Sequence, residues 1–247
     1  MKIDVYSNMW NEERILPYWL RHYETFADRI FVWDGGSTDK TLEILKRHPK
    51  VTLLPCEPRL LDDTYFITEL YPQYEKYSRG IADWVIIADA DEFIYHPNIK
   101  EVLRKAKDKG MQCIQCEGYS MVSNKLPTGD GQIYDEIKTG FQDEKYTKKT
   151  VFTPDIYIRF YRGRSFQPRG KHIVFDQRKE IKLLHYRFLG KDYLAERTQS
   201  NIDRWRMPSH LRFHPYSIEM PIRCPNGEIA PVLEWMEKNQ NNIPVIL

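Results

Sequence analysis

The chain has 247 residues, 41% of them hydrophobic and 13% aromatic, which is enough to bury the core of one large domain and excludes a disordered chain. With 37 basic and 35 acidic residues the net charge is +2, which argues against a protein that coats nucleic acid over its whole surface. The chain holds only four cysteines, no apolar run long enough to span a membrane and no apolar leader after Met1. We therefore expect a reduced, cytoplasmic protein.

Strand and helix patterns alternate in the first half of the chain. Residues 3–7 predict a strand, and a polar turn then leads into a helix with Asn11 as its N-cap and apolar residues at helical spacing as far as Phe26. Pro17 lies early in this helix and is expected to shorten or kink it.

One more helix and three more strands complete this pattern. We predict a helix around 42–45 that Ser37 or Thr38 caps, and strands at 29–33, 51–54 and 84–88. The last of these is almost entirely apolar, as a strand buried on both faces should be. The alternation predicts an α/β fold with a mostly parallel, Rossmann-like central sheet flanked by helices.

The half after residue 120 has long polar loops and short mixed segments. Strand-like patterns occur at 156–161, 173–176 and 181–186. We expect these strands and loops to close over the first half, so that residues 1–247 form a single domain.

An acidic segment follows the strand at 84–88 directly. If the chain stays extended there, Asp89 and Asp91 point the same way and aim two carboxylates at one point. Hard cations such as Mg²⁺ or Mn²⁺ take such oxygen ligands. The alternative is a solvated turn ahead of a helix that begins near Asn98.

Three motifs stand at comparable places after three of the strands: Asn11-Glu12-Glu13, Asp34-Gly35-Gly36-Ser37-Thr38-Asp39 and Asp89-Ala90-Asp91. Together they resemble the glycosyltransferases of the GT-A fold, most closely the family 2-like branch, over about residues 1–100. The resemblance implies a GT-A fold with a C-terminal strand, loop and helical extension. It also implies a nucleotide-sugar donor, by default a UDP-sugar, and Mn²⁺ or Mg²⁺ as cofactor. Residues 1–118 would be the nucleotide-binding half, and 119–247 the half that binds the acceptor and completes the metal site.

The resemblance also assigns roles to single residues. Asp34 would accept a hydrogen bond from the base, Asp89 would contact the ribose or a bound water, and Asp91 would hold the metal, for which Asp89 is a further candidate ligand. The segment 183–191 looks like one in which a late histidine, here His185, completes the coordination. The donor would also meet Asn11, Glu12, Ser37 and, at its diphosphate, Lys191. A strand-end histidine bonded to a carbonyl is the alternative for His185, and His172 is a weaker rival as ligand.

Transfer of a sugar also needs positive charge at the leaving diphosphate and a base for the acceptor hydroxyl. For an inverting enzyme Glu117 and Asp135 are base candidates, and no motif separates them from Asp130, Glu136 and Asp155. A basic stretch could add positive charge or form a solvated hairpin; its residues are Arg159, Arg162, Arg164, Arg169 and Lys171.

Other residues have structural interpretations. Cys113 and Cys116 lack the second pair that a zinc site needs, so we expect them to pack in the interior. We expect core packing also for Trp19, Trp33, Trp84, Tyr71, Tyr74 and Tyr77, whereas Trp205 and Trp235 could line either the core or an acceptor site.

The near-neutral total charge hides an asymmetry between the two halves. Residues 1–130 carry a net charge of −4 and residues 131–247 one of +6. This arrangement favours an anionic ligand such as a metal-chelated diphosphate between them, a saccharide or lipid-linked acceptor, and a peripheral position at the inner face of a membrane. We expect no nucleic-acid partner. The alternatives are a nucleotidyltransferase acting on a sugar phosphate and a non-catalytic module that binds RNA through the basic stretch.

Overall fold

The computed structural model describes residues 1–57, 65–161, 165–170, 172–205 and 246–247. In this part of the chain a mixed sheet is built from β1 (Ile3–Met9), β2 (Arg29–Asp34), β3 (Val51–Leu54), β4 (Trp84–Ile87), β5 (Glu92–Tyr95), β6 (Cys113–Ser123), β7 (Gly140–Gln142), β8 (Lys148–Phe152), β11 (Phe175–Asp176) and β12 (Lys182–Leu189). A separate hairpin consists of β9 (Tyr157–Tyr161) and β10 (Ser165–Arg169). The helices are α1 (Leu16–Glu24), α2 (Thr41–Arg47), α4 (Tyr74–Tyr77), α5 (Ile99–Asp108), α6 (Ile133–Glu136) and α7 (Lys191–Trp205). Short helical turns lie at Phe66–Leu70, Tyr71–Gln73 and Glu144–Tyr146.

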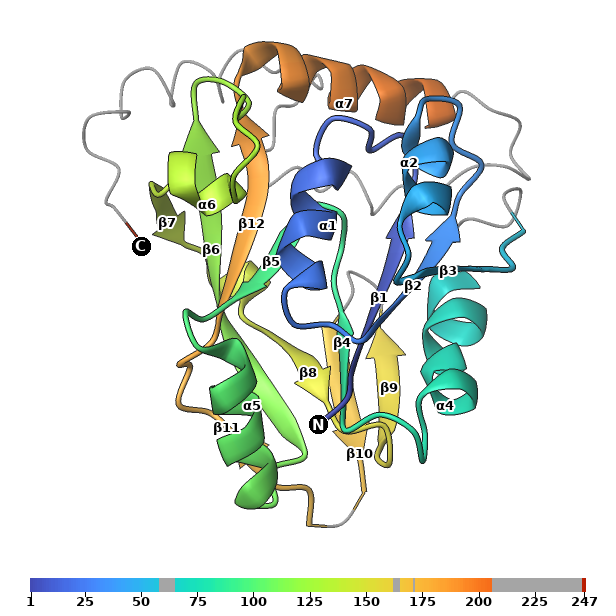
Figure 1. Cartoon of the computed structure of the whole chain (residues 1–247), viewed down its shortest axis with the longest axis vertical. Helices are drawn as coiled ribbons and strands as arrows, with labels where there is room; N and C mark the ends of the chain where they lie inside the picture. Colours follow the sequence, from blue (N-terminus) through green and yellow to red (C-terminus); the bar gives the residue numbers. More distant parts are fainter. Residues whose placement is uncertain (58–64, 162–164, 171, 206–245) are drawn as a thin grey trace.

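The sheet has a parallel first half and a mixed second half. Its strand order is β3-β2-β1-β4-β8-β6-β12-β5, with β7 and β11 also paired to β6. Strands β3, β2, β1 and β4 run parallel, whereas β8 is antiparallel to both β4 and β6. The predicted α/β class, a central sheet flanked by helices, is confirmed. The sheet places the carboxyl ends of β1, β2 and β4 at one edge, across which α7 runs (Figure 1).

Alternation along the strands gives each face of the sheet its own core. On β1, Val5 packs with one buried cluster and Tyr6 with the other, as the period of two in a strand requires. The cluster that contains Val5 includes apolar residues of α1 and α5. The cluster that contains Tyr6 includes residues of α4 and of the β9–β10 hairpin. These two clusters hold the strands in place, and the strand-end loops extend from this buried sheet.

Two predicted helix starts were wrong. Helix α1 begins at Leu16 rather than after Asn11, because Asn11 takes a positive φ of 54° and a turn at Glu12 precedes the helix. Pro17 then lies in the first turn, where its missing N–H costs nothing and no kink follows. The first N–H of α2 is capped by Asp39, whose Oδ1 accepts a hydrogen bond from Thr41, and not by Ser37 or Thr38.

The sequence did not predict three of the strands, β5, β7 and β8. Strand β5 follows the acidic segment immediately and pairs antiparallel with β12. Helix α5 begins at Ile99 with Asn98 as its N-cap, as predicted. His185 lies inside β12, opposite Glu92 of β5 and Ser120 of β6, and not after a strand as in the family pattern. The segments predicted at 156–161, 173–176 and 181–186 correspond to β9, β11 and β12.

The structural interpretations of the cysteine and aromatic residues are confirmed where the structure describes them. Cys113 and Cys116 are buried free thiols on β6, and burial raises the pKa of Cys113 to about 12. The three predicted core tryptophans and Tyr71 and Tyr74 are buried, and Tyr77 packs against the Phe31 ring. The side chain of Trp205 and the whole of Trp235 lie outside the described residues. Within the described residues, no helix is both long and apolar enough to cross a bilayer.

A buried histidine makes the stability of the fold depend on pH. Burial lowers the pKa of His22 from 6.5 to about 3, against the opposing effect of its Nε2 hydrogen bond to the Ile94 carbonyl. Between pH 6.5 and pH 3, His22 is protonated in the unfolded chain and neutral in the folded chain. Its contribution to the stability of the fold is therefore fully present above pH 6.5 and falls on acidification toward pH 3.

We expect the contribution of His22 to lower the free energy of unfolding by about 2 kcal/mol when the pH is lowered from 6.5 to 5. Urea denaturation at the two pH values measures this loss, and His22→Phe should remove it whatever the variant's absolute stability. Equal pH slopes in the wild type and the variant would contradict the assignment.

Candidate active site

The loops after β1 and β2 are held together by side-chain hydrogen bonds. The backbone N–H of Asn11 donates to Ser37 Oγ at 3.0 Å, and the N–H of Thr38 donates to Asn11 Oδ1 at 2.8 Å. The N–H of Glu12 donates to Thr41 Oγ1 at 2.7 Å. The positive φ of Asn11 allows this close approach. Two residues predicted to meet the donor, Asn11 and Ser37, therefore fix the shape of the strand-end loops.

Asp34 ends β2 with its carboxylate in a fixed orientation. Oδ2 accepts hydrogen bonds from the N–H groups of Gly36 and Ser37 at 3.2 and 3.1 Å. Oδ1 is buried and has no hydrogen-bond partner within the described residues. A buried acceptor without a donor is costly, so this oxygen is suited to a ligand that brings an N–H or O–H group.

The acidic segment after β4 is a tight turn and not an extended strand. The N–H of Glu92 donates to the Asp89 carbonyl at 3.0 Å, which closes the turn, and Trp19 Nε1 donates to the same carbonyl at 2.9 Å. The predicted extended geometry for Asp89 and Asp91 was therefore wrong. Asp91 is only 5% exposed, whereas Asp89 is half-buried.

Asp91 lies against His185 and a half-buried arginine. Oδ2 of Asp91 is 3.4 Å from His185 Nε2 and accepts a hydrogen bond from Arg197 Nη1 at 2.9 Å. The Tyr146 ring covers His185, with ring centroids 3.9 Å apart. Burial opposes ionisation of Asp91, but the charge of Arg197 and the interaction with His185 outweigh it and hold the pKa of this carboxyl well below its usual range. These partners favour the ionised form of Asp91 at the strand-end edge.

Arg197 on α7 is the functional residue that the sequence did not reveal. Besides Asp91 it binds Glu12 Oε1 through Nη2 at 3.2 Å, and it donates through Nη1 to the Tyr193 hydroxyl at 2.9 Å. Burial disfavours the charged form, but Glu12, Tyr193 and Asp91 raise the pKa of Arg197, so its guanidinium stays charged. The available signal was weak: Tyr193 and Arg197 are four residues apart and share one face of a helix.

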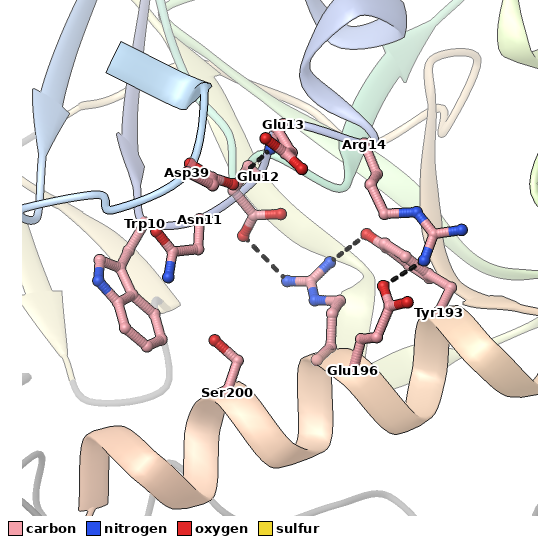
Figure 2. A pocket seen from close by; sticks show the side chains of 10 residues that line it. Trp10, Asn11, Glu12, Glu13, Arg14, Asp39, Tyr193, Glu196 and Ser200 are labelled. Atoms are coloured by element: carbon pink, nitrogen blue, oxygen red, sulfur yellow. Dashed lines mark hydrogen bonds and ion pairs between the residues drawn. The ribbon is translucent and has the colours of Figure 1, made fainter.

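A cavity of about 180 Å³ lies between the loop after β1 and helix α7. Figure 2 shows Glu12 and Glu13 on the loop side, with Glu196 and Ser200 on the helix below them. Arg14 pairs with Glu196 at one end of the cavity, and Trp10 lines the other end. The walls therefore carry charges of both signs, arranged in pairs between the loop and the helix.

The other predicted site residues have local partners or are exposed. Both carboxylate oxygens of Glu117 are bonded, one to the Tyr119 hydroxyl and one to Gln142 Nε2. Asp135 Oδ2 accepts from the N–H of Gln132, so Asp135 caps α6, and Lys191 is exposed in the first turn of α7.

The remaining alternatives are also placed where the structure describes them. Six of these residues are exposed: Asp130, Glu136, Asp155, Arg159, Arg169 and His172. Three others lie outside the described residues: Arg162, Arg164 and Lys171. The Arg159 guanidinium lies over the Tyr161 ring. Across the described ranges, no three His, Cys, Asp or Glu side chains are grouped as a metal site.

Comparison with known proteins bears on the fold. No protein-family model matches the sequence. A crystal structure of residues 1–349 of S. aureus TarS superposes with a TM-score of 0.50 at 14% identity, covering 83% of this chain and 66% of that one. Together with the sheet and the strand-end motifs, this likeness settles the architecture. The chain shares the α/β fold of this crystal structure, in agreement with the predicted GT-A fold.

The chain is also similar to one other solved structure and to two mycobacterial proteins. Glucosyl-3-phosphoglycerate synthase from Mycobacterium tuberculosis matches with a TM-score of 0.34 at 19% identity, over 48% of this chain and 44% of that one. Uncharacterized proteins of Mycobacterium tuberculosis and Mycobacterium bovis are each 33% identical over 116 residues. That match covers 44% of this chain and only 28% of each relative.

Proposed function

We propose that this chain is a glycosyltransferase that moves a sugar from a nucleoside-diphosphate sugar to a saccharide or lipid-linked acceptor, with inversion. The observation that carries the proposal is the buried, ionised Asp91 facing His185 at the carboxyl edge of the sheet. In open α/β sheets ligands bind beyond this edge. Burying a carboxylate at a ligand edge is costly unless it has a cationic partner or a function there.

Asp34 supports a nucleotide as part of the donor. Its unpartnered Oδ1 is an acceptor held in place by the two N–H bonds to Oδ2. A base that presents a ring N–H, as uracil does, would satisfy this oxygen. TarS, whose fold the chain shares, has been crystallised with UDP and with UDP-GlcNAc, so a UDP-sugar is the first donor to test. Asn11, Glu12, Ser37 and Asp89 would line the donor, and Lys191 would approach its diphosphate.

The chemistry of the donor set suits a divalent cation, Mn²⁺ or Mg²⁺. Asp91 offers a carboxylate oxygen and His185 an imidazole nitrogen 3.4 Å from it, which are ligands that Mn²⁺ accepts. His185 Nδ1 is buried and lacks a partner within the described residues, so this side chain's hydrogen bonding is incomplete. Asp91 and His185 would hold the cation, with Asp89 beside them. Such a cation supplies charge neutralisation at the leaving diphosphate.

Asp135 is the better of the two base candidates. Glu117 uses both carboxylate oxygens within the sheet region, whereas Asp135 is exposed and commits one oxygen to its own helix. We expect Asp135→Asn to lower the turnover number by about 10²-fold or more, the contribution that a general base makes. Glu117→Gln, the matched control, should keep most of the turnover. Equal losses in initial-rate assays of the two variants would contradict this choice.

The proposals for the acceptor and for the position in the cell are based on the distribution of charge along the chain. The half after residue 130 has a net charge of +6, which favours an anionic or lipid-linked acceptor and attraction to an anionic membrane surface. Binding to vesicles with and without anionic lipid measures this attraction.

The proposed reaction has a direct test. The protein is incubated with UDP-, GDP- and TDP-sugars and Mn²⁺, and the released nucleoside diphosphate is measured by mass spectrometry with and without an oligosaccharide mixture. We expect release from one donor class, with sugar added to an acceptor. In a parallel incubation with nucleoside triphosphates and a sugar phosphate, release of pyrophosphate would instead indicate a nucleotidyltransferase. Binding of RNA with no release from any nucleotide sugar would indicate the non-catalytic module.

A further inference from the structure

Arg197 and the proposed cation need the same oxygen atom. Asp91 Oδ2 accepts the hydrogen bond from Arg197 Nη1 and is also the oxygen nearest His185 Nε2. A metal ligated by this oxygen would lie close to the guanidinium, and two cations repel strongly where water is scarce. In the present arrangement the guanidinium fills the position between Asp91 and Glu12 and pairs with both carboxylates.

The same arginine fastens α7 to the edge of the sheet. It joins the helix to Glu12 in the loop after β1 and to Asp91 in the turn after β4. A second pair, Arg14 with Glu196, adds a more exposed contact between the loop and the helix (Figure 2). Exposed pairs contribute little, whereas a buried pair is strongly destabilised when one partner is removed. Arg197 therefore adds a polar tether to the apolar packing of Tyr193 and Leu194, which are buried on the same helix.

The cavity between α7 and the loop after β1 is small, and neither Asp34 nor Asp91 lines it. It holds about 180 Å³, whereas sites for drug-sized ligands typically hold about 300–1,000 Å³. The helix follows Gly190, whose φ of +88° turns the chain sharply between β12 and α7. A side chain at this position would meet the backbone of Asn124 and Lys125, so only glycine fits the turn that sets the direction of α7.

We propose that Arg197 and a divalent cation are alternative partners of Asp91, so that entry of the cation with the donor releases Arg197 and moves α7 away from the strand ends. This inference rests on the proposed function. In the cation-free state α7 closes the site, and the guanidinium prevents repulsion between Asp91 and Glu12. In the cation-bound state the metal takes over that role and α7 opens the edge to the nucleotide.

The first test measures Mn²⁺ binding to the whole protein without nucleotide, from the electron paramagnetic resonance signal of free Mn²⁺. Arg197→Gln removes the competing cation and should bind Mn²⁺ at least about tenfold more tightly than the wild type, because the binding-competent state is no longer a minor one. Arg197→Lys retains the charge and should bind more weakly than Arg197→Gln. Arg14→Gln is the matched control on the same helix contact and should bind like the wild type.

The second test needs no variant. Hydrogen exchange of residues 191–197 in the wild type should accelerate when Mn²⁺ and UDP are added together. Unchanged or slower exchange, or an Arg197→Gln variant that binds Mn²⁺ no more tightly than the wild type, would overturn the inference. If the wild type binds UDP with Mn²⁺ in that case, the proposed function stands and only the exchange of partners fails. If no form binds Mn²⁺ even with UDP, the metal-dependent function fails as well.

Discussion

Replacing Asp91 with asparagine is expected to lower the rate of sugar transfer by about 10³-fold, since a cation that neutralises a leaving group contributes several kcal/mol. Asparagine keeps the size of the side chain but removes the charge that Arg197 and His185 face. The measurement is the initial rate at saturating donor and Mn²⁺, with circular dichroism to show that the variant is folded.

Asp176 provides the matched control for this substitution. It is as buried as Asp91 and is also paired with an arginine, Arg178, but it lies on β11. Asp176→Asn should affect stability and leave the rate per folded molecule nearly unchanged. An Asp91→Asn variant that retains more than about a tenth of the wild-type rate, which is less than 1.4 kcal/mol of barrier, would contradict the role assigned to Asp91.

Adding a single methyl group at Gly118 should be the most damaging small change in the sheet. A Cβ there would lie 2.2 Å from the carbonyl carbon of Tyr146 and 2.5 Å from the backbone nitrogen of Thr147. Backbone atoms cannot rotate away as a side chain can, so the segment that carries Tyr146 must shift and its ring must leave His185. We expect Gly118→Ala to lower the free energy of unfolding by about 3 kcal/mol.

Gly110→Ala separates this overlap from backbone strain. Gly110 has a φ of +70° and nothing within 4 Å of its added Cβ, so the substitution should cost only about 1 kcal/mol of conformational strain. Urea denaturation of both variants gives the comparison. A Gly118→Ala variant as stable as Gly110→Ala would show that the chain around Tyr146 yields easily and does not hold the site rigidly.

The parallel half of the fold was predictable because its physical signal is local. Residues Trp84–Ile87 are all buried, and a strand covered on both faces is a continuous apolar run that can be found without knowing its neighbours. The start of α1 was not predictable in the same way. Asparagine is a common N-cap residue, but the side chain and backbone of Asn11 bind the loop after β2. That loop is distant in sequence, so the pattern around Asn11 does not reveal the contact.

The site shows the same division between local and distant information. The turn at Asp89 was mispredicted because the N–H of Glu92 closes it and Trp19 of α1 binds its carbonyl. The meeting of Asp91 with His185 followed from the family resemblance and not from any pattern in this sequence. Arg197 had only the weak local signal of its spacing from Tyr193, because its importance depends on how α7 packs across the edge of the sheet.

The opposite net charges of the two halves of the chain correspond to individual ion pairs in the structure. Arg197 of the basic half pairs with Glu12 and Asp91 of the acidic half. Lys148 pairs with Glu92 in the same way, at 2.5 Å and almost fully buried. Opposite charges in the two halves thus meet at the carboxyl edge, which is where the proposed diphosphate would add its own negative charge.

The most direct test of the central claim is a calorimetric titration of UDP, GDP and TDP into the wild-type protein, once with saturating Mn²⁺ and once with EDTA. The proposed function predicts that at least one nucleoside diphosphate binds with Mn²⁺, that its affinity falls by about tenfold or more in EDTA, and that Asp91→Asn abolishes the difference. Absence of binding by all three nucleotides, or equal affinity with Mn²⁺ and with EDTA, would contradict a metal-dependent donor site at Asp91 and His185.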